Sequence, residues 1–318
     1  MKLGFIYAGQ GSQRVGMGQD FYEKFPIYKN TIDEASKNVK KVTDMDVAEL
    51  SFNGPMEQLS QTKYTQPAMV AFAIGVTKLL KESGITPDYT CGLSLGEYSA
   101  LYSAEALDED TIMELIAKRG KYMEEASKGL NVKMAAVLGA DRETVVESCK
   151  EVTAAYRGEK IVQAANFNCP GQIVVSGDAE AVDKASANLK EAGVKRILPL
   201  NVSGPFHTKL MKPAGDALAK EFKNVDFKNL KSKVVFNCLG AEKSENDSIP
   251  ELLERQVQSS VYLEDSIKYM VDAGVDTIVE IGPGKAISKF VKKTTPDVKV
   301  YSIDTVEDFE TVVEELRA

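Results

Sequence analysis

The chain is organised around residues 91–98, Cys91-Gly92-Leu93-Ser94-Leu95-Gly96-Glu97-Tyr98. A short apolar run precedes them, and Tyr98, Leu101 and Tyr102 follow at helical spacing among alanines, which favour helix. A G-x-S-x-G pattern between a strand and a helix is the setting of a nucleophile elbow, where small residues permit a tight turn that exposes the serine. The first amides of the helix favour negative charge at the same place. The stretch therefore predicts an α/β fold with Ser94 as a nucleophile at the end of a sheet.

His207 is the only histidine of the chain, and a serine nucleophile usually needs a neighbouring base. Imidazole is the side chain best suited to move protons near neutral pH. His207 lies in a Gly-Pro loop after the strand-like segment 196–200, and the order serine before histidine is that of α/β-hydrolases. A solvated loop histidine is the alternative. The elbow and the histidine together favour a catalytic pair.

Arg119 falls on the apolar stripe of a predicted helix that begins near Asp110. The stripe is formed by Ile112, Leu115, Ile116 and Met123. An arginine that faces a core needs a partner, and its planar guanidinium suits a carboxylate in two-point contact. Two interpretations stay open at this point. One is an internal salt bridge or a snorkelling side chain; the other is an arginine that receives a substrate carboxylate.

Composition and charge narrow the class of protein. The chain has 318 residues, of which 43% are hydrophobic and 27% charged, as in ordinary soluble globular proteins. The net charge of −8 argues against a general nucleic-acid binder. No apolar stretch approaches the roughly 20 residues of a membrane span, and the N-terminal run is predicted as a first strand rather than a signal peptide. We expect a soluble, cytoplasmic protein that acts without nucleic acid or membrane.

The cysteines are widely spaced and include no C-x-x-C pair. They are Cys91, Cys149, Cys169 and Cys238. With a single histidine, this pattern argues against a zinc site. Free thiols in a reducing cytosol are the simplest account.

Residues 131–200 differ in pattern from the rest of the chain. Strands and helices are predicted there in the order β-α-β-β-α-β, a ferredoxin-like unit. Ser94 lies before this unit and His207 just after it, so we interpret it as an insert. The predicted organisation is an α/β-hydrolase-like catalytic domain, residues 1–130 and 201–318, with a ferredoxin-like inserted subdomain, residues 131–200. The active site is expected in the cleft between them.

A buried apolar helix is predicted to open at Thr65 or Gln66, with Pro67 in its first turn. The first strand, residues 3–7, runs into Gly9-Gln10-Gly11-Ser12-Gln13. That turn does not match a phosphate loop, because it lacks the Gly-Lys-Ser/Thr sequence. It can still donate backbone amides to a ligand.

Several motifs, in order and spacing, resemble the malonyl-CoA:acyl carrier protein transacylases of bacterial fatty-acid synthesis. The resemblance covers nearly the whole chain. Its motifs are Gly9-Gln10-Gly11-Ser12-Gln13, Gln66-Pro67-Ala68, the Gly-x-Ser-x-Gly-Glu elbow, Arg119-Gly120-Lys121, Asn166-Phe167-Asn168-Cys169-Pro170-Gly171-Gln172, Phe206-His207 with Leu210-Met211-Lys212-Pro213, Arg255-Gln256, and Glu280-Ile281-Gly282-Pro283-Gly284-Lys285.

This resemblance implies roles for the catalytic residues. Ser94 would take the malonyl group from malonyl-CoA, with His207 as base and then as acid. The backbone amides of Gln10 and Leu95 would form the oxyanion hole, which stabilises charge on the tetrahedral intermediate. The backbone carbonyl of Gln256 would orient His207, a role that an aspartate fills in other serine enzymes.

The resemblance also implies how substrates are held. Arg119 would clamp the malonyl carboxylate, Asn166 would line the site from the small domain, and Phe206 is similar to the malonyl-selecting form of its motif. The implied substrates are thioesters of CoA and phosphopantetheine, with no bound metal or cofactor. Acyl carrier proteins are acidic, so a rim of lysines is expected to receive one. The candidates are Lys209, Lys212, Lys285, Lys289, Lys292 and Lys293.

The main hypothesis is a ping-pong transfer of malonyl from CoA to Ser94 and then to acyl carrier protein, by a monomer. A serine esterase or thioesterase is the first alternative, and Arg119 speaks against it, since a general esterase has no use for a buried cation at its acyl pocket. A related acyltransferase that serves polyketide assembly is the second. A carrier-protein binding module without catalysis is the third, and it would not need the nucleophile.

Overall fold

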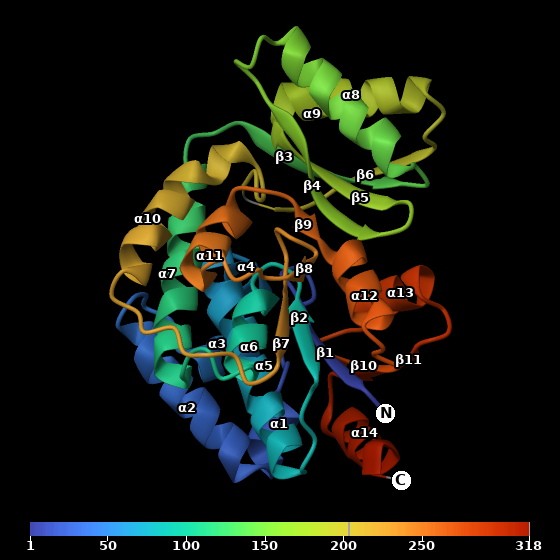
Figure 1. Ribbon diagram of the computed structural model, residues 1–318. Helices are drawn as coiled ribbons and strands as arrows, with labels where there is room; N and C mark the ends of the chain where they lie inside the picture. Colours follow the sequence, from blue (N-terminus) through green and yellow to red (C-terminus); the bar gives the residue numbers. More distant parts are fainter. Residues whose placement is uncertain (203, 318) are drawn as a thin grey trace.

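Two β-sheets organise the chain in a computed structural model, which describes residues 1–202 and 204–317 (Figure 1). The larger sheet has the strand order β11-β10-β1-β2-β7-β8. Its pairings are parallel except for the short antiparallel contact of β7 with β8. The strands are β1 (Leu3–Tyr7), β2 (Tyr89–Gly92), β7 (Lys233–Phe236), β8 (Ala241–Glu242), β10 (Thr277–Ile281) and β11 (Lys299–Ile303).

Helices cover both faces of this sheet (Figure 1). Strands β1 and β10 are buried at every residue, as expected for parallel strands whose two faces are both covered. The helices of this part are α1 (Gln19–Lys24), α2 (Pro26–Lys40), α3 (Val47–Asn53), α4 (Met56–Leu59), α5 (Thr62–Glu82), α6 (Gly96–Ser103), α7 (Glu109–Ser127), α10 (Lys212–Phe222), α11 (Ile249–Val257), α12 (Leu263–Asp272), α13 (Ala286–Thr294) and α14 (Val306–Arg317), with a 3₁₀ turn at Lys209–Met211.

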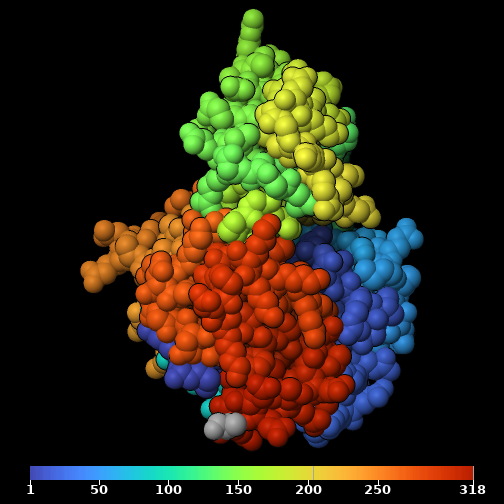
Figure 2. Space-filling model, turned by 90° about the vertical axis from the view of Figure 1, so that its right-hand side faces the viewer, coloured from blue at the N-terminus to red at the C-terminus, as the bar shows by residue number. Residues whose placement is uncertain are grey.

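The smaller sheet has the order β6-β3-β5-β4-β9. Four of its strands and two helices follow the predicted β-α-β-β-α-β order: β3 (Val132–Leu138), α8 (Arg142–Ala155), β4 (Val162–Cys169), β5 (Gln172–Asp178), α9 (Ala179–Glu191) and β6 (Arg196–Pro199). The fifth strand, β9 (Val261–Tyr262), comes from much later in the chain and runs parallel to β4. Figure 2 shows the green and yellow segment that contains this unit above the rest of the molecule, next to both the orange-red C-terminal part and the blue N-terminal part. The predicted α/β class with two sheets is confirmed; the domain boundaries stay a prediction.

The two faces of the smaller sheet have different neighbours. Because side chains alternate along a strand, Ala135 and Val137 of β3 pack into a separate core under α8 and α9. Met134 and Ala136 point the opposite way and join the main core of the molecule. Met134 of this second face and Asn166 of β4 line the same cavity as Ser94, so this face lies opposite the turn that carries Ser94.

The start of α5 differs from the prediction. The helix begins at Thr62, with Gln61 as N-cap, and Pro67 lies inside it rather than in its first turn. Its first residues are mostly polar, so the apolar pattern starts one turn late. Proline here removes one backbone hydrogen bond, a loss that the packing of this largely buried helix offsets. Gln66 is therefore a buried helical residue, 1% exposed, and not a cap.

Two further observations bear on the expected class. The four cysteines are free thiols, as predicted, and the structure buries all four. Within residues 1–202 and 204–317, no helix has both the length and the apolar character needed to cross a membrane.

Candidate active site

The elbow forms between β2 and α6, with Ser94 at its tip. Ser94 has φ of 56°, a left-handed conformation that is uncommon for residues other than glycine. The flanking glycines allow this turn because the chain approaches itself closely. A Cβ on Gly92 would lie 2.1 Å from the Gly96 backbone, and one on Gly96 would lie 2.5 Å from the Tyr7 carbonyl oxygen. The G-x-S-x-G pattern is thus a steric requirement of the fold.

His207 lies within hydrogen-bond distance of Ser94, although 113 residues separate them. Its Nε2 is 2.8 Å from the Ser94 Oγ, and its Nδ1 is 2.9 Å from the backbone carbonyl oxygen of Gln256. A carbonyl oxygen only accepts hydrogen bonds, so Nδ1 carries the proton and Nε2 is free to accept one. The arrangement leaves His207 ready to take the proton of the serine hydroxyl.

The charge state of His207 fits this role. The side chain is buried, and burial lowers its pKa to about 4, with a further lowering by the positive charge of Arg119. The hydrogen bond to Gln256 acts in the opposite direction but is the weaker influence. The imidazole is therefore neutral at pH 7, as a base must be before it accepts a proton.

Arg119 lies on α7, and its side chain is fully buried next to Ser94. Its guanidinium donates to the side-chain oxygens of Gln66 (2.6 Å) and Gln256 (2.8 Å) and to the Ser94 Oγ (3.1 Å). Across the described residues, no carboxylate forms an ion pair with it. A buried charge held only by neutral oxygens is costly, so the internal salt bridge considered from sequence is absent from this part of the chain.

A cavity of about 290 Å³ opens beside these groups. Ser94, His207, Gln10, Asn166 and Phe206 all line it. Gln10 comes from the turn after β1 and Asn166 from β4, so the cavity lies between the two sheets.

Leu95 directly follows Ser94 and is the N-cap of α6. Within the described part of the chain, neither its backbone amide nor that of Gln10 donates a hydrogen bond. Both amides thus remain available to a bound ligand.

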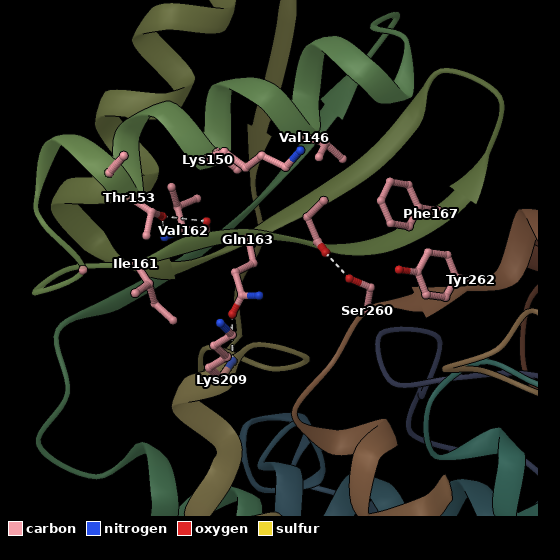
Figure 3. Close-up of a pocket in the computed structure, with 14 residues that line it drawn as sticks. Val146, Lys150, Thr153, Ile161, Val162, Gln163, Phe167, Lys209, Ser260 and Tyr262 are labelled. Carbon is pink, nitrogen blue, oxygen red and sulfur yellow. Dashed lines mark hydrogen bonds between the residues drawn. The ribbon is translucent and has the colours of Figure 1, made fainter. Parts of the chain in front are cut away.

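Strand β4 also fixes the segments that hold His207 and Gln256. The side-chain oxygen of Gln163 accepts from the Lys209 amide at 2.8 Å, two residues after His207. The Ser260 hydroxyl donates to the Ala164 carbonyl at 2.7 Å, four residues after Gln256. These bonds face a second hollow of about 480 Å³ under α8, lined mostly by apolar side chains (Figure 3). None of the predicted catalytic side chains lies in its wall.

Known proteins with similar sequences have an activity that fits this geometry. The model of the acyl transferase domain family matches residues 4–311. A malonyl CoA-acyl carrier protein transacylase of Bacillus subtilis is 42% identical over 316 residues, which cover 99% of this chain and 98% of that protein. The chain belongs to the malonyl-CoA:acyl carrier protein transacylase family. It is accordingly an enzyme, an acyltransferase.

Solved structures agree with this assignment. The MCAT of Streptococcus pneumoniae is 42% identical, with a TM-score of 0.92 over 99% of this chain and 100% of that one. A malonyl-transacylase in complex with a type II PKS acyl carrier protein is 34% identical, with a TM-score of 0.93 over 99% of this chain and 100% of that one. The two-sheet architecture is therefore that of the transacylase family.

The predicted lysine rim divides into groups in this transacylase. The Lys285 and Lys212 ammonium groups form ion pairs with Asp308 (3.5 Å) and Asp216 (2.5 Å) of the same chain. Lys209 lines the second hollow under α8. The remaining three, Lys289, Lys292 and Lys293, are exposed on α13. Helix α13 also contributes to the wall of the active-site cavity, through Ala286, Ile287 and Phe290.

The roles of Gln66 and Asn237 in the transacylase site were not predicted from sequence, and for Gln256 only the role of the backbone carbonyl was. Gln66 and the side chain of Gln256 hold Arg119, and Asn237 holds the elbow itself, with its side chain 2.7 Å from the Ser94 amide. The available signal for Asn237 was its place at the end of a buried parallel strand, where functional residues of α/β sheets gather. No cluster of His, Cys, Asp or Glu side chains suited to a metal ion occurs among the residues that the structure describes.

Proposed function

We propose that the enzyme moves a malonyl group from malonyl-CoA to Ser94 and then to the phosphopantetheine thiol of an acyl carrier protein, supplying extender units for fatty-acid synthesis. The observation that carries the proposal is the Ser94 Oγ, which lies 2.8 Å from the His207 Nε2 and 3.1 Å from the Arg119 guanidinium. A nucleophile, a base and a cation for a carboxylate thus meet at one atom. The substrates are already activated as thioesters, so the scheme needs no metal or bound cofactor.

The first half-reaction makes the acyl-enzyme. His207 takes the hydroxyl proton as the Ser94 Oγ attacks the thioester carbonyl carbon. The oxyanion that forms accepts hydrogen bonds from the amides of Leu95 and Gln10. As the intermediate collapses, the carbon–sulfur bond breaks and His207 returns its proton to the CoA thiolate.

The second half-reaction reverses these roles. His207 takes the proton of the phosphopantetheine thiol, and the sulfur attacks the malonyl ester on Ser94. The carbon–oxygen bond then breaks, and the serine oxygen regains a proton from His207. The Gln256 carbonyl accepts from the His207 Nδ1 throughout, which keeps the Nε2 aimed at the reacting atoms and stabilises the imidazolium.

Selectivity for malonyl is proposed to rest on Arg119. Its present partners are neutral oxygens, and a carboxylate is a stronger acceptor for a guanidinium. Binding of the malonyl carboxylate therefore compensates a buried charge, while an acetyl group leaves it uncompensated. We assign Asn166 and Phe206, on the cavity wall, to contacts with the acyl and pantetheine parts of the substrate.

The carrier protein is proposed to dock against α13. Three features support this face: exposed lysines, contact of the helix with the active-site cavity, and the acidic character expected of carrier proteins. The relative solved with a type II PKS acyl carrier protein leaves polyketide assembly as the second candidate for the pathway served. Parallel assays with carrier proteins of both pathways would separate the two.

Intact mass after mixing with malonyl-CoA tests the covalent step. Wild type is expected to gain one malonyl group, and Ser94→Ala none. Arg119→Ala is expected to form an acetyl adduct from acetyl-CoA as readily as wild type or better, and a malonyl adduct at least about a hundredfold more slowly. Malonyl-CoA hydrolysis by wild type without any adduct or transfer would favour the thioesterase alternative.

A further inference from the structure

Asn237 joins the two sides of the nucleophile elbow from a different part of the chain. It directly follows β7 and is fully buried. Its side-chain nitrogen donates to the Gly92 carbonyl at 2.6 Å, and its side-chain oxygen accepts from the Ser94 amide at 2.7 Å. The first bond lies before the turn and the second at its tip. One amide group therefore spans the elbow.

We propose that Asn237 is a positioning residue for acyl transfer, which holds the Ser94 turn so that the amide of Leu95 faces the developing oxyanion. This inference rests on the proposed function of Ser94. It concerns a residue that touches neither substrate nor reacting atoms and acts only through the elbow. Its effect is therefore expected in the rate of the chemical step rather than in substrate binding.

The orientation of the Asn237 amide is fixed by its partners. The Gly92 carbonyl can only accept and the Ser94 amide can only donate, so the side-chain nitrogen and oxygen have one consistent assignment. Because the Ser94 amide is bonded to Asn237, it has no proton left for a ligand. The next amide along the chain, that of Leu95, is the first one free to serve as an oxyanion donor.

A second set of contacts holds Asn237 in place. Its backbone amide donates to the Glu97 side chain at 2.5 Å, and Glu97 is itself fully buried in the first turn of α6. The side-chain nitrogen of Gln256 donates to the Ser94 carbonyl at 2.7 Å. The elbow is thus held from α6, from β7 and from α11. Such support matters because the left-handed conformation of Ser94 is strained for a residue that carries a side chain.

Single-turnover acylation of Ser94 by malonyl-CoA tests the proposal. Asn237→Ala removes both bonds, and the acylation rate constant is expected to fall about 10- to 100-fold, while the concentration of malonyl-CoA at half-maximal rate stays within about twofold. The adduct still forms on Ser94. Cys238→Ala is the matched control, because it alters the neighbouring buried residue of the same turn and leaves both bonds intact. It is expected to lower Tm without changing the acylation rate.

The variant Asn237→Asp adds a readout that a merely structural role would not produce. An ionised carboxylate accepts from Ser94 but cannot donate to Gly92, whereas a protonated one does both. The acylation rate of this variant should therefore rise as pH falls from 8 to 6 by more than the rate of wild type, in which the neighbouring Glu97, with its pKa raised to about 8, is the buried carboxyl that titrates in this range. The pH dependence of Asn237→Asp still tests the proposal if Asn237→Ala fails to fold.

The outcomes separate this inference from the proposed function. If wild type forms no malonyl adduct, the function of Ser94 fails first. If wild type forms the adduct, and both Asn237 variants acylate at the wild-type rate per folded molecule with no new pH dependence, the positioning role is overturned. A rate loss equal to that of Cys238→Ala would overturn it as well.

Discussion

Arg119 and Glu97 are two ionisable side chains that are fully buried close to Ser94. Burial raises the pKa of Glu97 to about 8, although the Asn237 amide and the Arg119 charge both act to lower it. One Glu97 oxygen accepts from Asn237, and the other has no hydrogen-bond partner among the described residues. Glu97 is therefore mostly protonated at neutral pH, and Arg119 has no ionised carboxylate beside it among the described residues.

The raised pKa of Glu97 predicts a loss of stability as pH rises from 4.5 to about 8. A carboxyl that is protonated in the folded state and ionised when unfolded stabilises fully below pH 4.5, and this contribution is lost as pH rises through about 8. The pKa of the buried His207 is lowered to about 4. Its contribution to the free energy of unfolding is therefore constant above pH 6.5 and decreases as pH falls below that value. Between pH 6.5 and 8, only the Glu97 contribution of this pair changes.

We expect the free energy of unfolding of wild type to fall by about 2 kcal/mol from pH 6.5 to 8, relative to Glu97→Gln, at about 1.4 kcal/mol per pH unit. Urea denaturation of both proteins at the two pH values measures this difference. Glutamine keeps an acceptor for the Asn237 amide, so the comparison isolates the ionisation. Parallel pH dependence of the two proteins would contradict a protonated Glu97.

The residues of the site with distinctive side-chain chemistry were the easiest to predict from the sequence. Ser94, His207 and Arg119 could be picked out because a nucleophile on an elbow, a lone histidine and a cation on an apolar stripe each break a local rule. Gln66 and Asn237 break none. Amide side chains are tolerated in many settings, and their partners here lie 53 and 143 residues away. Only the assembled fold shows what they hold.

Among the secondary-structure elements, the N-terminus of α6 packs directly against the carboxyl end of β1. Its first residue, Gly96, has the Tyr7 carbonyl oxygen where a side chain would begin. The contact brings the N-terminus of α6, and with it the Leu95 amide, to the edge of the sheet. Helix α6 can therefore approach β1 this closely only because Gly96 has no Cβ atom.

Gly96→Ala is expected to destabilise the fold by about 1–3 kcal/mol, because backbone must move to admit the methyl group. The acylation rate is expected to fall as well, since the Leu95 amide shifts with α6. Urea denaturation and single-turnover acylation measure the two effects. Ser99→Ala on the same helix is the control: its buried hydroxyl has no partner among the described residues, so its removal should leave stability unchanged or improved.

Long elements were predicted well, and short ones were missed. Strand β1 was placed at its observed bounds, and the start of α7 was placed within about one residue, since both have strong apolar or periodic patterns. The two-residue strands β8 and β9 carry no such pattern. They form because the fold brings a sheet edge beside them, a condition that no local sequence encodes.

For the whole molecule, the balance of charge is the feature that matters most for a macromolecular partner. The chain carries a net charge of −8, so an acidic carrier protein must be received at a locally basic face. Lys293 follows Phe290, which lines the cavity, by one helical turn, and its ammonium group lies near Gly171 of the β4–β5 turn. The proposed docking face thus touches both sheets.

The double variant Lys289→Ala, Lys293→Ala is expected to raise the KM for acyl carrier protein about two- to tenfold, since exposed charges contribute modestly to association. Malonyl adduct formation from malonyl-CoA should be unchanged. A matched double variant on α9, Lys184→Ala with Lys190→Ala, removes the same charge from the outer face of the smaller sheet. Equal effects of the two double variants on the carrier protein KM would contradict docking at α13.

Strand β9 makes the smaller sheet dependent on the rest of the chain. It pairs with Asn166 and Phe167, and its Tyr262 ring stacks on Phe167 at a centroid distance of 5.2 Å. A polypeptide of residues 131–200 alone would lack this donated strand, and the backbone of β4 would be left open at that edge. Open edges recruit strands from other molecules. The segment is contiguous in sequence, yet it is not self-sufficient, and transplanting it into another protein would require a substitute strand for β9.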